Sequence, residues 1–396
     1  MTSGTRQHKD RNFVTLSSII NKKDMSNTKI STKTQNLLWA ISGGRCEFEG
    51  CNKPLYKDIL TKKRYNNAYI AHIVADSPDG PRGDVERSPL LADDINNLML
   101  MCDNHHRLID TNIEEYPEDR LLDMKRKHEK RIARVTAISP NMGTNIILYG
   151  ANIGRHTAAL SYDSACEALG EDYYPAEDHP IEIGFKNSEG RDSVDGYWGT
   201  EVDNLCAHME KQVLSHIRNG ESMHYSVFAI APQPLLIKLG TLLNDIHSVR
   251  VYQKHRESST WEWLNESETL QYEFSGPENY GGTPVLVIGL SATITYDRII
   301  EVLGGDVSIW HIVIPNPNND CMRNEQSLVE FRRVARYAMD TIKTHHGCRE
   351  LHIFPAMPVS AAIEFGRVWM PKADMPLVIY DQNKERGGFY KTITIE

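Results

Sequence analysis

The pattern of apolar and polar positions changes near residue 145. Before this point, short apolar groups alternate with polar stretches, and the charged segment that ends the region has the period of an amphipathic helix. We predict a helix, two strands and two further helices over residues 34–41, 68–74, 97–102, 104–110 and 119–135. Residues 1–30, rich in Lys, Asn, Ser and Thr, are expected to form a flexible or oligomerisation arm.

Beyond residue 145, apolar segments of strand length alternate with helical ones. The predicted strands lie at 146–150, 181–185, 225–231, 249–253, 284–290, 308–314, 351–356 and 376–380. Helical periodicity covers 200–218, 234–245, 325–344 and 359–369. This alternation predicts an α/β layered domain with mostly parallel strands.

Two segments of this second region share one order of features. Residues 226–240 run from a strand through two prolines into a helix that ends near a glycine, and residues 351–366 repeat this order. Two related α/β halves in tandem would account for the length of the region. Because the spacing is inexact, chance similarity is the alternative.

Length and charge support a division into a smaller head and a larger body. A chain of 396 residues exceeds one ordinary core and predicts two or three domains. Residues 1–140 carry 23 Lys and Arg against 19 Asp and Glu, whereas the remainder carries 21 against 34. We expect a polyanion to meet the head rather than the acidic body. Ordinary solvated surface is the alternative for so small a basic excess.

Cysteine usage and hydropathy indicate the compartment. No apolar run approaches the length of a membrane span, and the first residues lack the apolar core of a signal peptide. Three of the seven cysteines fall within one segment of the head. This usage favours a cytoplasmic protein with a metal site over a disulfide framework.

Four residues of the head have the spacing of a zinc site. Cys46 and Cys51 form one close pair, and Cys102 and His105 form another. Structural zinc takes four thiolate or imidazole ligands, commonly as two such pairs. The roughly fifty residues between the pairs imply that zinc would hold a whole lobe together. Buried thiols and a surface histidine are the alternative.

Three other polar residues suggest phosphodiester hydrolysis, which needs a base for water and a cation for the phosphate. His72 lies near the end of a predicted strand, before a loop rich in glycine and proline. Asn97 precedes the next strand and is expected to orient the imidazole. His106, on the following helix, is expected to bind the catalytic metal. A structural histidine in a strand is the alternative for His72 alone.

The order of these residues, with Ala71 before His72 and Asp110 after His106, resembles the HNH endonucleases of ββα-metal fold over about residues 40–115. The resemblance implies that His72 is the general base, Asn97 the middle residue and His106 a ligand of a catalytic divalent cation such as Mg²⁺. Cys46, Cys51, Cys102 and His105 match the structural zinc ligands, with His105 where many members have a fourth cysteine. Since Ala71 stands where many relatives have an acidic residue, Asp110 or Asp76 is left to complete the catalytic shell.

Ligand contacts in the body are expected at the carboxyl ends of its strands, where helix N-termini offer free N–H groups to phosphates. Two strand-to-helix turns and a nearby segment with cations and tryptophans supply the candidate residues. They are Pro232, Gln233, Lys238, Gln253, Arg256, Trp261, Trp263, Pro355, Ala356, Pro358 and Ser360. Aromatic faces hold bases. Core packing is the alternative for each tryptophan.

The body from about residue 150 to 396 resembles the SAVED domain, and the resemblance rests on residues 224–240, 249–263, 308–317 and 351–381. It implies two fused CARF-like Rossmannoid halves that bind a cyclic di- or trinucleotide, which would explain the internal repeat.

An HNH domain over residues 31–140 followed by a SAVED domain over 145–396 is similar to the effector nucleases of CBASS antiphage defence in bacteria. The implied function is cleavage of double-stranded DNA, triggered by a cyclic oligonucleotide, in a homo-oligomer that assembles further from dimers. Two alternatives remain: a modification-dependent or constitutive restriction nuclease whose body binds DNA, and a zinc-stapled DNA-binding module without catalysis.

Overall fold

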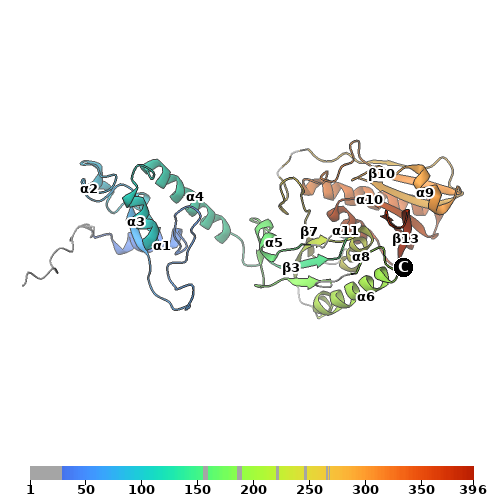
Figure 1. Ribbon diagram of the computed structural model, residues 1–396, viewed down its shortest axis with the longest axis horizontal. Helices are drawn as coiled ribbons and strands as arrows, with labels where there is room; N and C mark the ends of the chain where they lie inside the picture. The colour runs from blue at the N-terminus through green and yellow to red at the C-terminus, as the bar shows by residue number, and fades with distance from the viewer. Residues whose placement is uncertain are drawn as a thin grey trace, which may run out of the picture. The chain divides into compact units, whose positions relative to one another are not determined.

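The computed structural model describes residues 29–154, 159–184, 190–219, 223–244, 248–264, 266 and 268–396. The chain forms two units, with the division between Ala137 and Ile138 (Figure 1). Most of the arm expected over residues 1–30 lies outside the described residues. Within the described residues, none of the helices has the length and apolar character needed to cross a membrane.

Unit 1 centres on two short antiparallel strands and the helix that follows them. β1 (Tyr69–His72) pairs with β2 (Leu98–Met101), and α3 (Asp103–Thr111) begins two residues after β2. The other elements are α1 (Thr32–Ile41), α2 (Arg87–Leu91), the 3₁₀ turn η1 (Ile95–Asn97) and α4 (Glu118–Thr136). The predicted helix, two strands and two further helices are present in this order, whereas α2 and η1, which lie between the strands, were not predicted.

The core of unit 1 lies around β2, whose four residues are all buried. They pack in one apolar cluster with Leu38 of α1, Ile109 of α3 and Leu121 of α4. Local chemistry sets the limits of α1. The Ser31 side chain accepts the Thr34 N–H at 3.2 Å, and two glycines with φ of +63° and +64° follow the helix.

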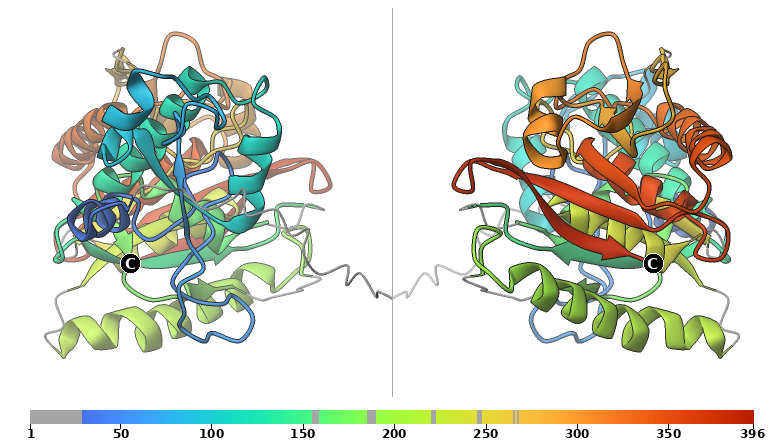
Figure 2. Two further views of the ribbon diagram at one scale, coloured as in Figure 1. Left: turned by 90° about the vertical axis from the view of Figure 1, so that its left-hand side faces the viewer. Right: turned by 90° about the vertical axis from the view of Figure 1, so that its right-hand side faces the viewer.

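The first half of unit 2 is a parallel sheet in the order β4-β3-β6-β7, with β5 also paired to β3. Its strands are β3 (Gly143–Gly150), β4 (Tyr174–Pro175), β5 (Ile181–Ile183), β6 (His224–Ile230) and β7 (Ser248–Val251). Its helices are α5 (Tyr162–Ala168), α6 (Tyr197–Met209) with a π turn (Glu210–Leu214), α7 (Ser215–Arg218) and α8 (Gln233–Leu243). In both views of Figure 2, the helical run that begins with α6 lies along the outside of this unit.

The second half of unit 2 is a larger sheet in the order β13-β12-β11-β9-β10-β8. Its strands are β8 (Glu273–Ser275), β9 (Thr283–Gly289), β10 (Val307–Val313), β11 (Leu351–Ala356), β12 (Leu377–Asn383) and β13 (Gly388–Ile395). Its helices are α9 (Tyr296–Leu303), α10 (Glu325–His346) and α11 (Val359–Val368). The four central strands are parallel and the two edge strands are antiparallel, which confirms the α/β prediction for the body.

The internal repeat is present in the structure. In each half a strand leads through a proline into a helix and returns to a parallel neighbouring strand: β6–α8–β7 and β11–α11–β12. The two repeated helices pack against each other through glycines. A Cβ on Gly240 would overlap the Ile363 carbonyl, and a Cβ on Gly366 would overlap the Ile237 carbonyl. The close contact between α8 and α11 is thus reciprocal.

Candidate functional site

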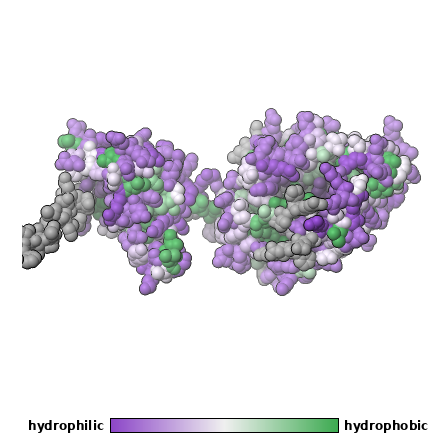
Figure 3. All heavy atoms as spheres, in the orientation of Figure 1, coloured by the Kyte–Doolittle hydropathy of each residue, from purple (hydrophilic) through white to green (hydrophobic). Residues whose placement is uncertain are grey.

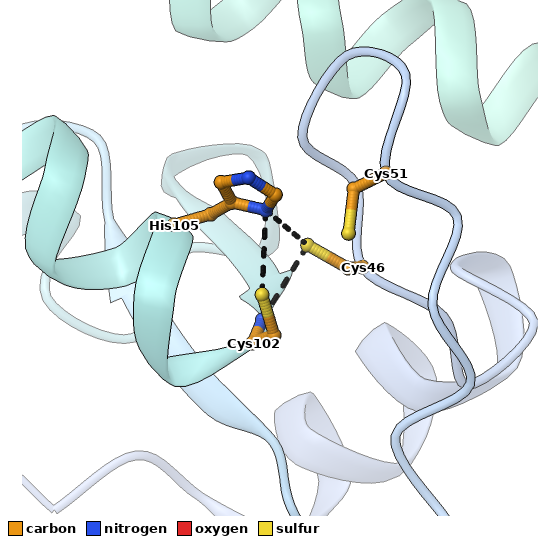
Figure 4. Close-up of side chains that lie close together, drawn as sticks. All are labelled: Cys46, Cys51, Cys102 and His105. Atoms are coloured by element: carbon orange, nitrogen blue, oxygen red, sulfur yellow. Dashed lines mark hydrogen bonds between the residues drawn. The ribbon is translucent and has the colours of Figure 1, made fainter. Parts of the chain in front are cut away.

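The four predicted zinc ligands lie together in unit 1 (Figure 4). Cys46 and Cys51 come from the loop after α1, Cys102 is the N-cap of α3, and His105 is in the first turn of that helix. Their ligand atoms all lie within 4.8 Å of one another. The His105 Nδ1 atom is 3.6 Å from the Cys46 sulfur and 3.3 Å from the Cys102 sulfur.

The donor set and spacing fit a tetrahedral zinc ion. Zn–S bonds of about 2.3 Å place two sulfur ligands roughly 3.8 Å apart, and nitrogen–sulfur pairs slightly closer. The Phe48 ring stacks on His105 at 4.0 Å between ring centroids and fixes the imidazole plane. Burial raises the pKa of the Cys46 thiol and lowers that of His105. A bound cation would reverse the effect on the thiol, because metal ions stabilise the thiolate.

His72 ends β1, and a backbone carbonyl holds its imidazole. The His72 Nε2 atom lies 3.0 Å from the Ala92 carbonyl oxygen. Since a carbonyl only accepts, Nε2 carries a proton, and in the neutral imidazole Nδ1 therefore holds the lone pair. The tautomer therefore assigns the role of a base to Nδ1.

Asn97 does not orient the imidazole directly, contrary to the sequence-based expectation. Its Oδ1 accepts the Val74 N–H at 2.8 Å, and its Nδ2 donates to the carbonyls of Val74 at 2.8 Å and Leu91 at 3.2 Å. The buried amide is thus occupied by backbone groups. Because Val74 follows His72 by two residues and Leu91 precedes Ala92, Asn97 positions the base and its carbonyl partner through the chain.

His106 lies on α3 beside a carboxylate. Its Nε2 is 3.7 Å from Asp110 Oδ2, and its ring stacks on Tyr69 of β1 at 5.3 Å. Both members of the pair are partly exposed, at 29% and 33%. Asp110, one of the two acidic candidates from the sequence, is therefore an acidic neighbour of His106.

These residues fit a catalytic cation only in part. Within the described ranges, the cluster around Cys46 is the one group of three or more metal-binding side chains. His106 and Asp110 offer one nitrogen and one carboxylate, a mixed set that suits ions such as Mn²⁺ or Zn²⁺ better than an all-oxygen Mg²⁺ shell. Water and substrate oxygens would have to complete the coordination.

Arg82 is a functional candidate that the sequence did not single out. Only 6% of its side chain is exposed, and it joins the end of β1 to α3. It donates to the carbonyls of Ile73 at 2.6 Å and Ile109 at 2.8 Å, and to Asp110 Oδ1 at 3.1 Å. Arg82 thereby fixes the carboxylate beside His106. In sequence it is one arginine in a glycine- and proline-rich loop, and no pattern distinguishes it from a surface residue.

Glu47 is a second buried group without a sequence signal. It is 1% exposed and accepts the Leu100 N–H, which ties the cysteine loop to β2. Burial raises the pKa of this carboxyl to about 8, and nearby Lys125 opposes the shift.

The basic helix predicted over 119–135 is α4, and much of its charge is neutralised within the helix. Lys125 pairs with Glu129, and Arg126 and Lys127 both pair with Asp123. This pairing favours a solvated connecting helix over a phosphate-binding surface.

In unit 2, the two predicted strand-to-helix turns face each other and are bonded across the halves. Gln233 at the start of α8 accepts the Met357 N–H at 2.9 Å. Gln253, just after β7, accepts the backbone N–H of Ser360 at 3.1 Å and its hydroxyl at 2.8 Å. These glutamines therefore join the halves, which leaves their amides committed to protein partners.

Several residues predicted to bind the nucleotide are interior residues, which corrects that expectation. Trp261 is 3% exposed and meets the Phe228 ring edge-on at 5.4 Å, so protein side chains cover its faces. Three prolines and one serine of the turns are also buried: Pro232, Pro355, Pro358 and Ser360. Lys238, Trp263 and Ala356 are partly exposed, and Arg256 is exposed. Whether the residues of such turns are exposed depends on how the opposite half of unit 2 packs against them. A sequence pattern does not show this packing.

A charged cavity of about 670 Å³ lies between the halves, at the amino ends of β6 and β7. Arg250 of the first half bonds Asp172 at 2.7 Å and Glu325 of the second half at 2.8 Å. On the opposite wall, buried Arg367 bonds Glu364 at 2.6 Å. The cavity is thus lined by charges that compensate one another across the halves.

Comparisons with known proteins identify the second part of the chain. Residues 206–395 match the family model described as the SMODS-associated and fused to various effectors sensor domain, SAVED. No curated protein matches the chain.

Solved structures with low identity are also similar. The Acinetobacter baumannii Cap4 SAVED/CARF-domain receptor with the cyclic trinucleotide 2'3'3'-cAAA is 12% identical, with 78% of this chain and 66% of that chain covered and a TM-score of 0.43. The same receptor with 3'3'3'-cAAA is 13% identical, with 79% of this chain and 71% of that chain covered and a TM-score of 0.42. The Moraxella osloensis Cap4 SAVED/CARF-domain receptor is 11% identical, with 72% of this chain and 64% of that chain covered and a TM-score of 0.35. The chain therefore spans about two thirds of the length of these receptors.

The family match falls on the α6–β13 part of unit 2, which contains both repeated units and the contact between α8 and α11. The predicted resemblance of the body to the SAVED sensor domain is confirmed over residues 206–395.

Proposed function

We propose that this protein is a metal-dependent DNA endonuclease of bacterial antiphage defence, of the CBASS effector type, whose activity is triggered by a cyclic oligonucleotide. One observation carries the catalytic part: His72 ends a strand of a ββα arrangement, with its tautomer set by the Ala92 carbonyl. The SAVED domain in the same chain supports control by a second messenger, because its family is defined as sensors fused to effectors.

In the proposed reaction, His72 Nδ1 removes a proton from the water that attacks the phosphodiester. The resulting imidazolium keeps its Nε2–H bond to Ala92, which holds the ring in place during the transfer. A divalent cation at His106 and Asp110 would stabilise charge on the phosphate and on the leaving oxygen. Arg82 positions Asp110, and Asn97 positions the segment after His72.

For the sensor, we propose that a cyclic di- or trinucleotide binds near the N-termini of α8 and α11. Helix N-termini favour phosphates, and here a phosphate would have to displace Gln233 and Gln253 from the Met357 and Ser360 N–H groups. Gln233 and Gln253 connect the two halves at this place, so a ligand that competes for them would change how the halves pack. Such a change would alter contacts between copies of the chain and assemble a homo-oligomer. Two HNH sites brought together in this way would cut both strands of a duplex.

Plasmid cleavage with and without cyclic oligonucleotides tests the proposal. Wild-type protein with Mn²⁺ or Mg²⁺ is expected to cut only when the activating ligand is present. His72→Ala should reduce the rate by about 10²–10⁴-fold, the usual contribution of a general base. His179→Ala changes an exposed histidine of unit 2 and serves as the matched control.

Two outcomes would overturn parts of the proposal. Equal cutting with and without every ligand would remove the gating and favour a constitutive nuclease. Cutting by His72→Ala at the wild-type rate would remove the assigned base.

A further inference from the structure

A hairpin extends from unit 1 between the cysteine loop and β1. It comprises residues 56–65 and is visible as the blue loop that extends away from the helices of this unit in Figure 1. The Tyr65 N–H bonds the Tyr56 carbonyl at 3.1 Å, and the Asp58 N–H bonds the Lys63 carbonyl at 2.9 Å. Antiparallel bridging between Lys57 and Arg64 completes the pairing. The segment is thus an ordered projection with its own backbone bonds.

The tip of the hairpin presents two apolar side chains to solvent. Leu60 is 89% exposed and Ile59 is 46% exposed. The turn beneath them is fixed, because the Asp58 carboxylate accepts the Thr61 N–H at 2.6 Å, a bond that also lowers the pKa of Asp58. Figure 3 shows apolar surface at the end of this projection. A rigid turn that holds apolar residues in water indicates a surface used for contact.

Positive charge surrounds this apolar tip. Residues 53–65 contain five basic side chains and one acidic one, Asp58. The basic residues are Lys53, Lys57, Lys62, Lys63 and Arg64. The last three are exposed. On α4, by contrast, Arg126 and Lys127 share the carboxylate of Asp123. The hairpin therefore concentrates the basic excess of the head.

The base of the hairpin is attached to both parts of the candidate site. On one side, the Cys46 N–H bonds the Lys53 carbonyl at 3.0 Å, next to the predicted zinc ligands. On the other side, the Asn67 N–H bonds the Leu55 carbonyl at 2.8 Å, two residues before β1 begins. Leu55 itself is fully buried. These bonds thus join the base of the hairpin to the cysteine loop and to the segment that leads into β1, the strand that ends in His72.

We propose that the 56–65 hairpin is a DNA-binding wedge. Ile59 and Leu60 enter a groove of the duplex and partly unstack a base step, while Lys62, Lys63 and Arg64 bind the flanking phosphates. Proteins that bend DNA combine apolar wedges with flanking cations in this way.

Duplex DNA fits this surface better than a protein does. Two exposed apolar residues are enough for a wedge, but they cover far less than the roughly 800 Å² per partner of a stable protein interface. The competing occupant is the acidic body of the same chain, whose residues 141–396 carry 34 acidic against 21 basic side chains. The proposal rests on the proposed function, since it assumes that unit 1 acts on DNA.

Binding of a labelled duplex to full-length protein tests the wedge. All variants carry His72→Ala, so that cleavage does not complicate the measurement. Combined Lys62→Gln, Lys63→Gln and Arg64→Gln should weaken binding at least tenfold and reduce the slope of log affinity against log salt by up to about 3, near 0.9 per lost phosphate contact. The matched control, Arg126→Gln with Lys127→Gln on α4, should leave the slope close to that of the parent.

The apolar tip has a separate readout. A duplex labelled with 2-aminopurine becomes brighter when the base unstacks, and the parent protein should produce this increase. Ile59→Ala with Leu60→Ala should abolish the increase and leave the salt slope unchanged. Because these side chains are exposed, folding should be unaffected, which thermal unfolding of each variant checks.

The outcomes separate the wedge from the nuclease proposal. Unchanged affinity, slope and fluorescence in the hairpin variants would overturn the wedge, whereas cleavage by protein with intact His72 would still support the nuclease. Ligand-independent cleavage by the same triple substitution in a protein with intact His72 would also overturn it, in favour of docking onto the acidic body. Absence of DNA binding and cleavage under all conditions would overturn both proposals.

Discussion

The interactions that stabilise the interior differ between unit 1 and unit 2. In unit 1, polar side chains reach the interior and bond backbone groups, as Asn97, Glu47 and Arg82 do. In unit 2, an extensive apolar core includes a helix pair in contact through Gly240 and Gly366. Beyond its apolar core around β2, unit 1 thus depends on a few specific polar groups, whereas unit 2 depends more on its extensive apolar core. Different substitutions should therefore disrupt each unit and leave the other intact.

Loss of a predicted zinc ligand should have the largest effect on the stability of unit 1. Cys102→Ser is expected to remove bound zinc and to unfold unit 1, because structural zinc sites have apparent binding free energies of roughly 10–16 kcal/mol. Hydrogen exchange should become fast in β2 and stay slow in β11 of unit 2. Metal analysis and exchange of the same samples measure both effects.

Cys348→Ser is the matched control, since Cys348 is an exposed thiol of unit 2. The Cys348→Ser protein should retain bound zinc and slow hydrogen exchange in β2. A Cys102→Ser protein that kept one zinc per chain and a protected β2 would show that unit 1 does not need this site.

Unit 2 should be most sensitive to substitutions that add volume where α8 and α11 are in contact. A Cβ on Gly240 would overlap the Ile363 carbonyl and lie 2.8 Å from the Gly366 Cα. Gly240→Ala should therefore lower the free energy of unfolding of unit 2 by roughly 1–3 kcal/mol, the usual cost of overpacking, without affecting unit 1. Denaturant unfolding followed by tryptophan fluorescence measures it.

Gly199→Ala provides the comparison within α6. Nothing lies within 4 Å of its added Cβ, so alanine should be neutral or stabilise the helix by up to about 1 kcal/mol. If Gly240→Ala and Gly199→Ala lowered the free energy of unfolding by the same amount, the close contact between α8 and α11 would not explain the effect of Gly240→Ala.

Acid should destabilise unit 2 through His224. Burial, with a contribution from Arg250, lowers the pKa of this histidine to about 4. In the unfolded chain His224 binds a proton near pH 6.5, whereas in the folded protein it does so only near pH 4. The free energy of unfolding of unit 2 is therefore highest above pH 6.5 and decreases as the pH falls toward 4. The loss should reach at most about 3 kcal/mol, since the side chain is partly exposed.

His224→Gln removes the titration and keeps a polar partner for Thr144, whose hydroxyl lies 2.8 Å from His224 Nδ1. The stability difference between the variant and wild type should therefore shift in favour of the variant between pH 6.5 and 4. A constant difference over this interval would exclude His224 as the source.

The sequence predicted those features of the fold and of the candidate site that depend on the spacing of neighbouring residues. Periodicity gave the α/β order of unit 2, and paired spacing identified Cys46, Cys51, Cys102 and His105, which the structure brings together. These features are local because strands, helices and ligand pairs form from neighbouring residues.

What the sequence could not predict depends on long-range placement. The partner of His72 is a carbonyl twenty residues away, and this partner depends on the path of the intervening loop. Trp261 could not be assigned to the core, because the side chains that cover it come from other strands. Residues that close a site from a distance, such as Arg82, lack a pattern altogether.

The central claim is that unit 2 senses a nucleotide and unit 1 cuts DNA in response. One titration with cyclic oligonucleotides, read both as the melting temperature of the sensor and as plasmid cleavage, tests it most directly. Wild-type protein should show both responses with the same midpoint, and His72→Ala should keep the melting shift and lose cleavage. Cleavage that is independent of the ligand shift, or that persists in His72→Ala, would contradict the account.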